Sequence, residues 1–473
     1  MRTPLHVAAL VLLAGIPLPA QTARNTRLLG AFTTRGGVLD LALVSDASGG
    51  SFAVLATSAG TSVVDCRVPG SPKETGFFPG PRTDWRRVAR AGKYLYVASE
   101  GGPGLRILDL SSPLRPKLVK SWNGNLWKWA HGLRVSPDGR HLWVFGTDRG
   151  LLVLDIRRQP SNPILAAAWK GPWVADLLVH GDTAELAEPF AGTWTRLDLT
   201  RFPLLTKRVS VRTPLAFPRS FSLDDSGHLL VVEDHPAGGD LAIYDLSQPK
   251  APKLLGRTRA ASSSKGLAFG VEARKGLAFT AWGTEGLRIF DLLRPDRPTE
   301  IASYDTFPGA SGGRHGASAV RRDPVSGRIF LADLDRGLFI LESSTDRRLY
   351  GVGTPGYEDL VPELDFEGSS AAGRILRLDL RKAHPQAPLF LLLGTSKASL
   401  KLRELTILVD PRSALVLPAG STDRGGAFRM DLSFPVSIGA GNSPLDLQFL
   451  VLDKLGSLGF AASRGLSLAV FRP

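Results

Sequence analysis

The stretch Gly104-Leu-Arg-Ile-Leu-Asp109 decides the architecture, because variants of it recur along the chain at a nearly constant interval. Each variant has a glycine or an aspartate, then alternating apolar residues, then an acid. The seven variants occupy residues 60–65, 104–109, 150–155, 192–198, 240–245, 286–291 and 337–342. Their final acids lie 43 to 51 residues apart, a pitch typical of propeller blades made of four strands. The repeat therefore predicts an all-β chain that contains a seven-bladed β-propeller.

A further short strand follows each of the first six copies after a turn marked by proline, as Lys253-Leu-Leu-Gly256 follows Pro252. Proline cannot donate a hydrogen bond to a strand ladder, so it belongs in these connections. The seventh copy has no such strand after it. Near the N-terminus, however, Leu28-Leu29-Gly30 matches Leu254-Leu255-Gly256. We therefore predict that a strand at residues 26–32 completes the last blade and removes the free edges of the array.

Three motifs resemble the LVIVD-repeat family. They are Asp84-Trp85-Arg86, Ala130-His131-Gly132-Leu133 and Ala332-Asp333-Leu334-Asp335-Arg336-Gly337-Leu338-Phe339-Ile340-Leu341. The span of residues 26–342 is similar to the secreted choice-of-anchor B proteins, which share such a propeller and differ at the C-terminus. The resemblance implies histidines at the start of several inner strands, and this chain keeps two of them, His131 and His315. It implies no particular biochemical activity.

The repeat ends before Leu349, and the remaining sequence has alternating runs such as residues 375–380 and 466–471. Short strands separated by turn residues at this spacing favour a β-sandwich. We therefore expect a propeller at residues 25–345, a linker at 346–356 and a C-terminal β-sandwich at 357–473.

The N-terminus has the pattern of a signal peptide. Arg2 precedes an apolar run from Leu5 to Leu18 that His6 alone interrupts, and the small residue Ala20 follows. The run is too short to span a membrane comfortably. We expect a signal peptide at residues 1–20, cleaved after Ala20 or, as the lesser choice, after Ala23. The protein is then secreted, periplasmic or at the cell surface, with no transmembrane segment after signal removal.

The net charge is strongly positive, because 58 Lys and Arg residues face 44 Asp and Glu residues, which gives +14 at pH 7. Such a charge attracts nucleic acid or other anions, but export makes nucleic acid an unsuitable partner. A protein, a glycan or a small anionic ligand remains. The only cysteine, Cys66, excludes an intrachain disulfide and a cysteine-rich zinc site. We expect no cofactor.

A ring of polar residues is expected at one end of the central channel. Aligned on their first buried apolar residue, the inner strands carry a polar residue two positions earlier in most blades. These residues, with Asp176 beside them, are Arg86, His131, Arg219, Lys265 and His315. A concave ring of cations concentrates anions, and arginine can bind a carboxylate, phosphate or sulfate through two hydrogen bonds. We expect the two histidines to add positive charge below about pH 6.5. The alternative is an ordinary hydrated channel lining, and an alignment error of one residue would turn these side chains to the other face.

Other motifs favour structural roles. Ser311 lies in a nucleophile-like Gly309-Ala-Ser-Gly-Gly313 string, but no helix is expected after it. The glycines of 351–356 resemble a dinucleotide fingerprint interrupted by Pro355. Asp333 and Asp335 resemble the start of a calcium loop that lacks its final glutamate, so they are at most a weak metal site and fit a tight turn better.

Six tryptophans crowd into blades two and three: Trp85, Trp122, Trp127, Trp129, Trp143 and Trp169. We interpret them mainly as core between blades, although a surface cluster would suit a sugar or a partner.

Two functions fit these observations. The first is a non-enzymatic exported propeller that binds a partner or an anion, with the C-terminal module as a spacer or attachment. The alternative is a hydrolase or lyase, lactonase-like, with its site at the channel. An enzyme of that kind needs a metal cage or an acid–base pair near the channel, whereas the aligned positions supply mainly cations. We therefore favour binding over catalysis.

Overall fold

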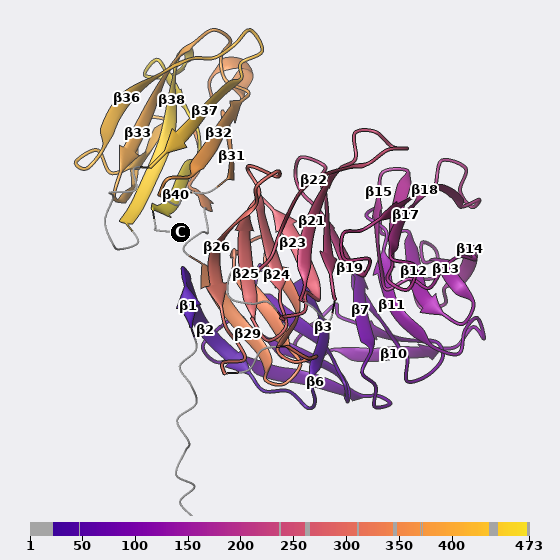
Figure 1. Ribbon diagram of the computed structural model, residues 1–473. Helices are drawn as coiled ribbons and strands as arrows, with labels where there is room; N and C mark the ends of the chain where they lie inside the picture. Colours follow the sequence, from indigo (N-terminus) through magenta and orange to yellow (C-terminus); the bar gives the residue numbers. More distant parts are fainter. Residues whose placement is uncertain are drawn as a thin grey trace, which may run out of the picture.

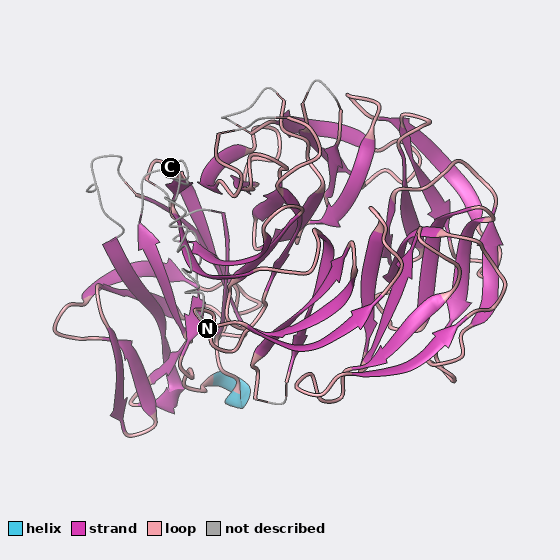
Figure 2. Cartoon of the chain, turned by 90° about the horizontal axis from the view of Figure 1, so that it is seen from below, coloured by secondary structure: helices cyan, strands magenta, loops and turns pink. Residues whose placement is uncertain are grey.

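The fold is known from a computed structural model of the chain. It describes residues 22–470 except 47, 236–237, 261–264, 310–311, 344–347, 369, 371 and 435–442. The proposed signal peptide lies outside the described residues, and so does Ser311. Almost every described element is a strand, and Figure 2 shows the one described helix, the short η1 (Tyr357–Asp359), in cyan.

Seven antiparallel sheets form the propeller (Figure 1). Blade one is β3 (Val38–Ser45), β4 (Ser51–Thr57), β5 (Gly60–Asp65) and β6 (Lys73–Pro79). Blade two is β7 (Arg86–Ala91), β8 (Tyr94–Ser99), β9 (Leu105–Asp109) and β10 (Lys117–Trp122). Blade three is β11 (Ala130–Val135), β12 (His141–Thr147), β13 (Gly150–Asp155) and β14 (Ile164–Trp169). Blades four and five are β15 (Asp176–His180), β16 (Thr183–Glu188), β17 (Thr193–Asp198) and β18 (Thr206–Arg212); and β19 (Pro218–Leu223), β20 (Leu229–Glu233), β21 (Asp240–Asp245) and β22 (Lys253–Thr258). Blade six is β23 (Gly270–Arg274), β24 (Leu277–Ala281), β25 (Leu287–Asp291) and β26 (Thr299–Tyr304); blade seven begins with β27 (Ala317–Arg322), β28 (Ile329–Asp333) and β29 (Gly337–Ser343).

The first strand of each blade is the inner strand. Each of these strands lies beside the first strand of the next blade, and β27 lies beside β3, so the ring is closed. The predicted all-β propeller with seven blades is confirmed.

The N-terminal strand closes the last blade, as predicted. β2 (Thr26–Phe32) pairs antiparallel with β29, which gives the sheet order β2-β29-β28-β27. A second short strand, β1 (Ala23–Arg24), pairs with β26 and adds a fifth strand to blade six. The first residues of the described chain therefore join two blades that lie nearly 300 residues later in the sequence.

The match between Leu28-Leu29-Gly30 and Leu254-Leu255-Gly256 reflects a shared bulge. In both outer strands the register skips the middle leucine, and each of the other five outer strands has a bulge at the same place. A Cβ on Gly30 would lie 1.9 Å from the carbonyl oxygen of Pro69, and one on Gly256 would lie 2.3 Å from that of Pro295. Glycine follows the bulge here because the proline turn of the next blade lies directly against it.

The apolar core lies between neighbouring blades. Trp122 and Trp127 pack with residues of blades two and three, and Trp143 packs with residues of blades three and four. These three rings are core, as the sequence indicated. Trp129 is 42% exposed, and Trp85 and Trp169 are half-buried.

The C-terminal module has three sheets. The largest contains β30 (Arg348–Tyr350), β40 (Gly465–Val470), β38 (Ser443–Ser457), β33 (Pro388–Gly394) and β36 (Leu415–Ser421), with β39 (Phe460–Ala462) beside β38. The others are β31 (Glu363–Gly368), β32 (Ile375–Arg381) and β37 (Phe428–Ser433), and the pair β34 (Lys397–Leu402) and β35 (Leu405–Val409). One apolar cluster joins the first two sheets, for example through Leu378 on β32 and Phe449 on β38.

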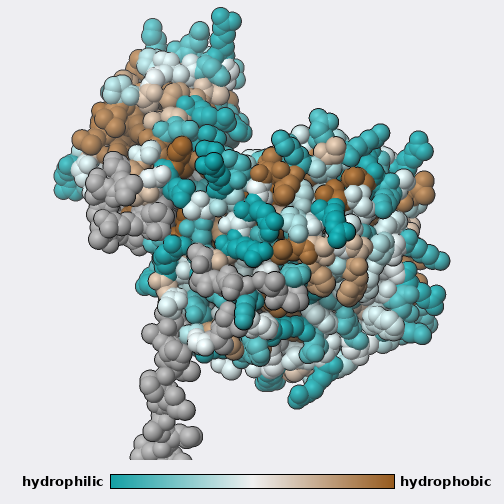
Figure 3. Space-filling view, viewed as in Figure 1, coloured by the Kyte–Doolittle hydropathy of each residue, from teal (hydrophilic) through white to brown (hydrophobic). Residues whose placement is uncertain are grey.

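The edge strand β36 is apolar and uncovered. Leu415, Val416 and Leu417 are all exposed, and Figure 3 shows an apolar area on the side of the module where Figure 1 places β33 and β36. The facing sheet has only three strands, so it leaves this edge without a partner layer.

The predicted linker at 346–356 is wrong in its extent. Arg348–Tyr350 forms β30, which pairs with β40, and Thr354 makes a bridge to Ala462. Backbone hydrogen bonds therefore build most of this segment into the C-terminal module, which begins before residue 357.

Candidate binding site at the channel mouth

The channel between the inner strands is lined by charges of both signs. A cavity of about 220 Å³ is bounded by Asp40, Arg87, Arg134, Asp176 and Arg321, which come from five different inner strands. Arg134 binds Asp176 through two hydrogen bonds, of 2.9 Å from Nε and 2.6 Å from a terminal nitrogen. Oδ1 of Asp40 lies 3.6 Å from a terminal nitrogen of Arg87 and 3.6 Å from one of Arg321. The channel itself is therefore largely charge-compensated.

The mouth of the channel differs, because aromatic rings and cations from distant blades converge on Trp85. The guanidinium carbon of Arg219 lies 4.4 Å from the centre of the Trp85 ring, and that of Arg314 lies 3.8 Å from it. The ring of His131 is centred 4.6 Å from Trp85. A terminal nitrogen of Arg314 also donates a 2.6 Å hydrogen bond to the carbonyl of Asp84. Cations and π faces thus hold one another in place across the mouth.

Arg219 is the least satisfied cation of this group. It is only 6% exposed, and its Nε has no hydrogen-bond partner. The nearest carboxylate oxygen, Oδ2 of Asp234, lies 3.9 Å away. Burial lowers the pKa of Arg219 to about 10, and the charges of Arg87 and Arg314 act in the same direction. A buried guanidinium with so few acceptors gains from an added anion.

His131 is buried and paired with Glu100. Its Nδ1 lies 2.7 Å from Oε1 of Glu100, and its Nε2 is buried without a partner. Burial lowers the pKa of His131 well below its usual value, with further lowering by Arg219, Arg87 and Arg314. These effects oppose the gain of positive charge in mild acid that we expected for His131. Burial raises the pKa of Glu100, against the opposing effect of Arg219 and Arg314.

Arg86 does not join the mouth. Its terminal nitrogens donate hydrogen bonds to the carbonyls of Thr57, Gly60 and Pro81, and burial lowers its pKa to about 10. The side chain alternates to the side of blade one and secures the turn between β4 and β5. Its placement in the ring is a correction of the alternation that the sequence alignment assumed.

The other predicted residues are spread over the same end of the propeller. Asp176 lies inside the channel on Arg134, and Lys265 is exposed on the loop before β23, near Gly312. His315 is exposed, lies 3.0 Å from Asp335 and stacks on Phe307. Of the six predicted residues, only His131 and Arg219 meet, both on Trp85.

The two candidate metal ligands serve a turn. Oδ1 of Asp333 accepts hydrogen bonds from the backbone N–H groups of Asp335 and Arg336, and Oδ2 of Asp335 accepts one from Gly316. Burial raises the pKa of Asp333. Among the described residues, no three His, Cys, Asp or Glu side chains gather closely enough to hold a metal ion. The described chain also has no helix of the length and apolar character needed to cross a bilayer.

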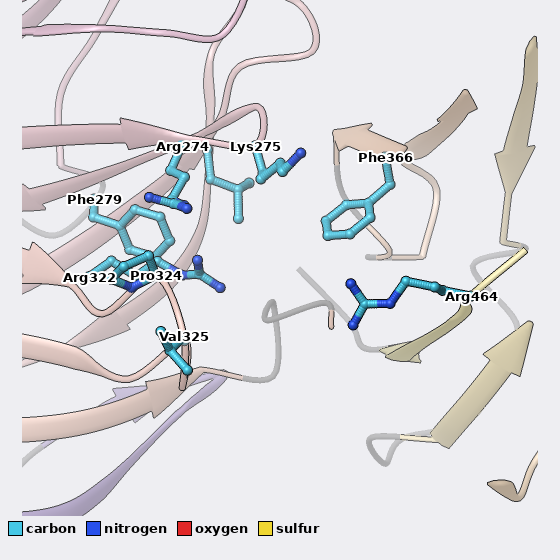
Figure 4. Close-up of a pocket in the computed structure, with 10 residues that line it drawn as sticks. Arg274, Lys275, Phe279, Arg322, Pro324, Val325, Phe366 and Arg464 are labelled. Carbon is cyan, nitrogen blue, oxygen red and sulfur yellow. The ribbon is translucent and has the colours of Figure 1, made fainter. Parts of the chain in front are cut away.

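A second cleft, of about 270 Å³, separates the propeller from the C-terminal module (Figure 4). Figure 4 shows Arg274 and Arg322 on the propeller side, with Phe366 and Arg464 on the other. Lys275 forms an ion pair with Asp365, and its ammonium nitrogen lies 5.5 Å from the centre of the Phe366 ring. These contacts place the module against blade six.

A comparison with protein families finds a match within the propeller. A family described as LVIVD repeat matches residues 84–124, which is the whole of blade two together with Trp85. No curated protein matches the chain. Among solved structures, the chain is similar to the crystal structure of the Myceliophteria thermophila Cps50 (Swd1) beta-propeller domain. The identity is 13%, the match covers 67% of this chain and 99% of that one, and the TM-score is 0.49. The repeat match and the closed ring define the class: this chain is a β-propeller repeat protein.

Sequence reasoning missed most of the channel and half of the mouth. Three arginines of the channel, Arg87, Arg134 and Arg321, each lie inside an inner strand next to an apolar residue. Because side chains alternate along a strand, this pattern could have predicted that the arginines face the channel. Trp85 was part of a repeat motif, but its contacts come from blades far away in the sequence. Glu100 and Arg314 lie in connections, where no periodicity predicts which way a side chain points.

Proposed function

We propose that this chain is an exported, non-enzymatic propeller of the choice-of-anchor B type that binds an anionic group at its channel mouth. The observation that carries the proposal is a pair of guanidiniums on one indole: Arg219, which is buried with few acceptors, and the exposed Arg314 both contact Trp85. An anion that Arg314 holds near Trp85 would compensate the charge of Arg219, whose Nε has the carboxylate oxygen of Asp234 no closer than 3.9 Å. The C-terminal module, proposed as a β-sandwich, would serve as a spacer or attachment, and the uncovered strand β36 supports that role.

Burial of His131 favours binding over the alternative of a channel hydrolase or lyase. A general base must reach the proton that it removes, and His131 is only 1% exposed with Nε2 buried.

Thermal unfolding in citrate, sulfate or acetate, compared with chloride at matched ionic strength, tests the anion site. An anion that binds only the folded state raises the midpoint by mass action. We expect a shift that Arg314→Gln reduces and Arg219→Gln abolishes, whereas Arg294→Gln, an exposed arginine far from the mouth, leaves it intact. Because Arg219→Gln alters a buried site, Arg314→Gln is the decisive variant. An equal shift in all variants would assign the effect to bulk salt and reject the site.

Export is tested by the N-terminus of the protein produced with its own leader. Thr22 accepts a hydrogen bond from Asp305, and Ala23 pairs with Tyr304. Cleavage after Ala20 would keep both contacts, whereas cleavage after Ala23 would remove them. We expect intact mass to give a chain that starts at Gln21, and an uncleaved chain would contradict the proposal.

A further inference from the structure

Aromatic rings continue from Trp85 around the channel mouth. The centre of the Trp173 ring lies 4.6 Å from that of His131, the Phe190 ring lies 5.1 Å from Trp173, and the Phe217 ring lies 6.4 Å from Phe190. With Trp85 and His131 these rings come from the ends of blades two to five. We call the five rings, Trp85, His131, Trp173, Phe190 and Phe217, the aromatic track.

The outer part of the track is open to solvent. Phe190 is 76% exposed, and it is the most exposed large apolar residue among those that the structure describes. Trp173 and Phe217 on either side of it are half-buried. Exposure of a phenylalanine between two further rings costs hydration free energy in the free protein, and a ligand that covers it recovers that cost.

We infer that the aromatic track binds an acidic oligosaccharide, a chain of sugar rings that carry carboxylates, with one carboxylate at Arg219 and Arg314. This inference rests on the proposed anion site. Successive rings are inclined by 46°, 65°, 49° and 88°. The rings of the open part of the track, Trp173, Phe190 and Phe217, therefore offer faces of changing direction to the C–H faces of a twisting sugar chain, while the two guanidiniums meet its charge.

The arrangement fits a single-stranded nucleic acid or a peptide less well. Sequence-tolerant nucleic-acid sites place cations along the whole strand beside their aromatic rings. In the described structure the cation–π contacts to the track, from Arg219 and Arg314, are both at Trp85. A peptide needs partners for its backbone groups, and the phenyl rings of Phe190 and Phe217 offer it none.

Binding of tetragalacturonic acid, followed by calorimetry and by tryptophan fluorescence, tests the inference. The comparison ligands are maltotetraose, an oligoglutamate of equal charge and a short oligothymidylate. Because Phe190 is exposed, Phe190→Ala should fold normally, and we expect it to weaken binding about fivefold, the effect of one aromatic contact. Val68→Ala, which alters an equally open apolar residue in the turn after β5, is the control and should leave binding unchanged.

Each outcome supports or contradicts binding of an acidic oligosaccharide to the aromatic track. Tighter binding of the uronate than of maltotetraose and oligoglutamate, with loss in Phe190→Ala alone, supports the track. Equal binding of oligoglutamate would show that the site recognises negative charge alone, which contradicts the inference. Tighter binding of oligothymidylate would show that the ligand is a single-stranded nucleic acid and not an oligosaccharide. If small anions stabilise the protein through Arg314 but no oligosaccharide binds, the track is wrong and the anion site stands. If neither binds, both proposals fail.

Discussion

The indole of Trp85 contacts two guanidiniums, and the buried one, Arg219, has its carbon 4.4 Å from the ring centre although it belongs to blade five and Trp85 to blade two. The contact crosses the mouth of the propeller. Arg314 contacts the same ring at 3.8 Å from the loop before β27. Three parts of the chain that lie more than 90 residues apart are thus held by one side chain.

Replacing Trp85 by Leu should destabilise the protein by about 1–2 kcal/mol, because two cation–π contacts are lost and Arg219 stays buried. Urea unfolding measures the change. Trp129→Leu is the matched control, because Trp129 is also near the start of an inner strand and is 42% exposed. An equal loss in both variants would mean that the contacts with Arg219 and Arg314 contribute nothing.

Gly30→Val should disturb ring closure. The new Cβ would meet the carbonyl of Pro69 at 1.9 Å, so β2 must shift away from β29, with an expected cost of roughly 2–3 kcal/mol. Gly102→Val is the control, because a Cβ there meets nothing within 4 Å. Thermal unfolding of the two variants compares the sites, and a midpoint for Gly30→Val equal to that of Gly102→Val would contradict the closure argument.

Asp40→Asn should leave Arg87 and Arg321 facing each other without their shared carboxylate. We expect a loss of about 2 kcal/mol, smaller at high ionic strength because salt screens the remaining repulsion. Asp296→Asn, which removes the exposed partner of Arg294, should leave stability nearly unchanged because water already screens this pair. Denaturant unfolding at two salt concentrations checks both variants. A loss that does not depend on salt would point to packing instead of charge.

His131 makes stability depend on pH. Its pKa is lowered in the folded state by burial and by Arg219, Arg87 and Arg314, with Glu100 on Nδ1. Below the unfolded value of about 6.5, the unfolded chain therefore binds a proton that the folded chain does not, and stability falls as pH falls. His131→Asn keeps Glu100 and removes this titration. The unfolding free energy of the wild type should decline relative to that variant between pH 7 and pH 5; a constant difference would show that His131 titrates normally.

Lys275→Glu should loosen the C-terminal module, because it turns the ion pair with Asp365 into a repulsion and removes the ammonium near Phe366. Small-angle X-ray scattering should give a larger radius of gyration. Lys382→Glu is the control, because Lys382 pairs with Glu363 inside the module. The same dimensions for both variants would mean that Lys275 does not hold the module in place.

The closed all-β ring was predictable from the sequence, because strand pattern, turn prolines and pitch are local features that every blade repeats. Even the closing strand followed from three residues, Leu28-Leu29-Gly30, because they match the bulge and the glycine of the outer strand of blade five. The sequence also indicated where the propeller ends. It did not indicate that part of the predicted linker forms a strand, because the pairing of Arg348–Tyr350 with β40 joins residues more than 110 positions apart.

Only the tertiary structure decides which residues meet at the channel mouth. A strand alternates its side chains between two faces, so one residue of error separates Arg86, which binds carbonyls of blade one, from Arg87, which reaches Asp40 in the channel. Loop side chains have no period at all, and Glu100 and Arg314 therefore gave no signal. The sequence alignment predicted a ring of cations that included Arg219. Only the packing of distant blades determined that Arg219 and Arg314 meet on Trp85, where burial leaves Arg219 with few acceptors.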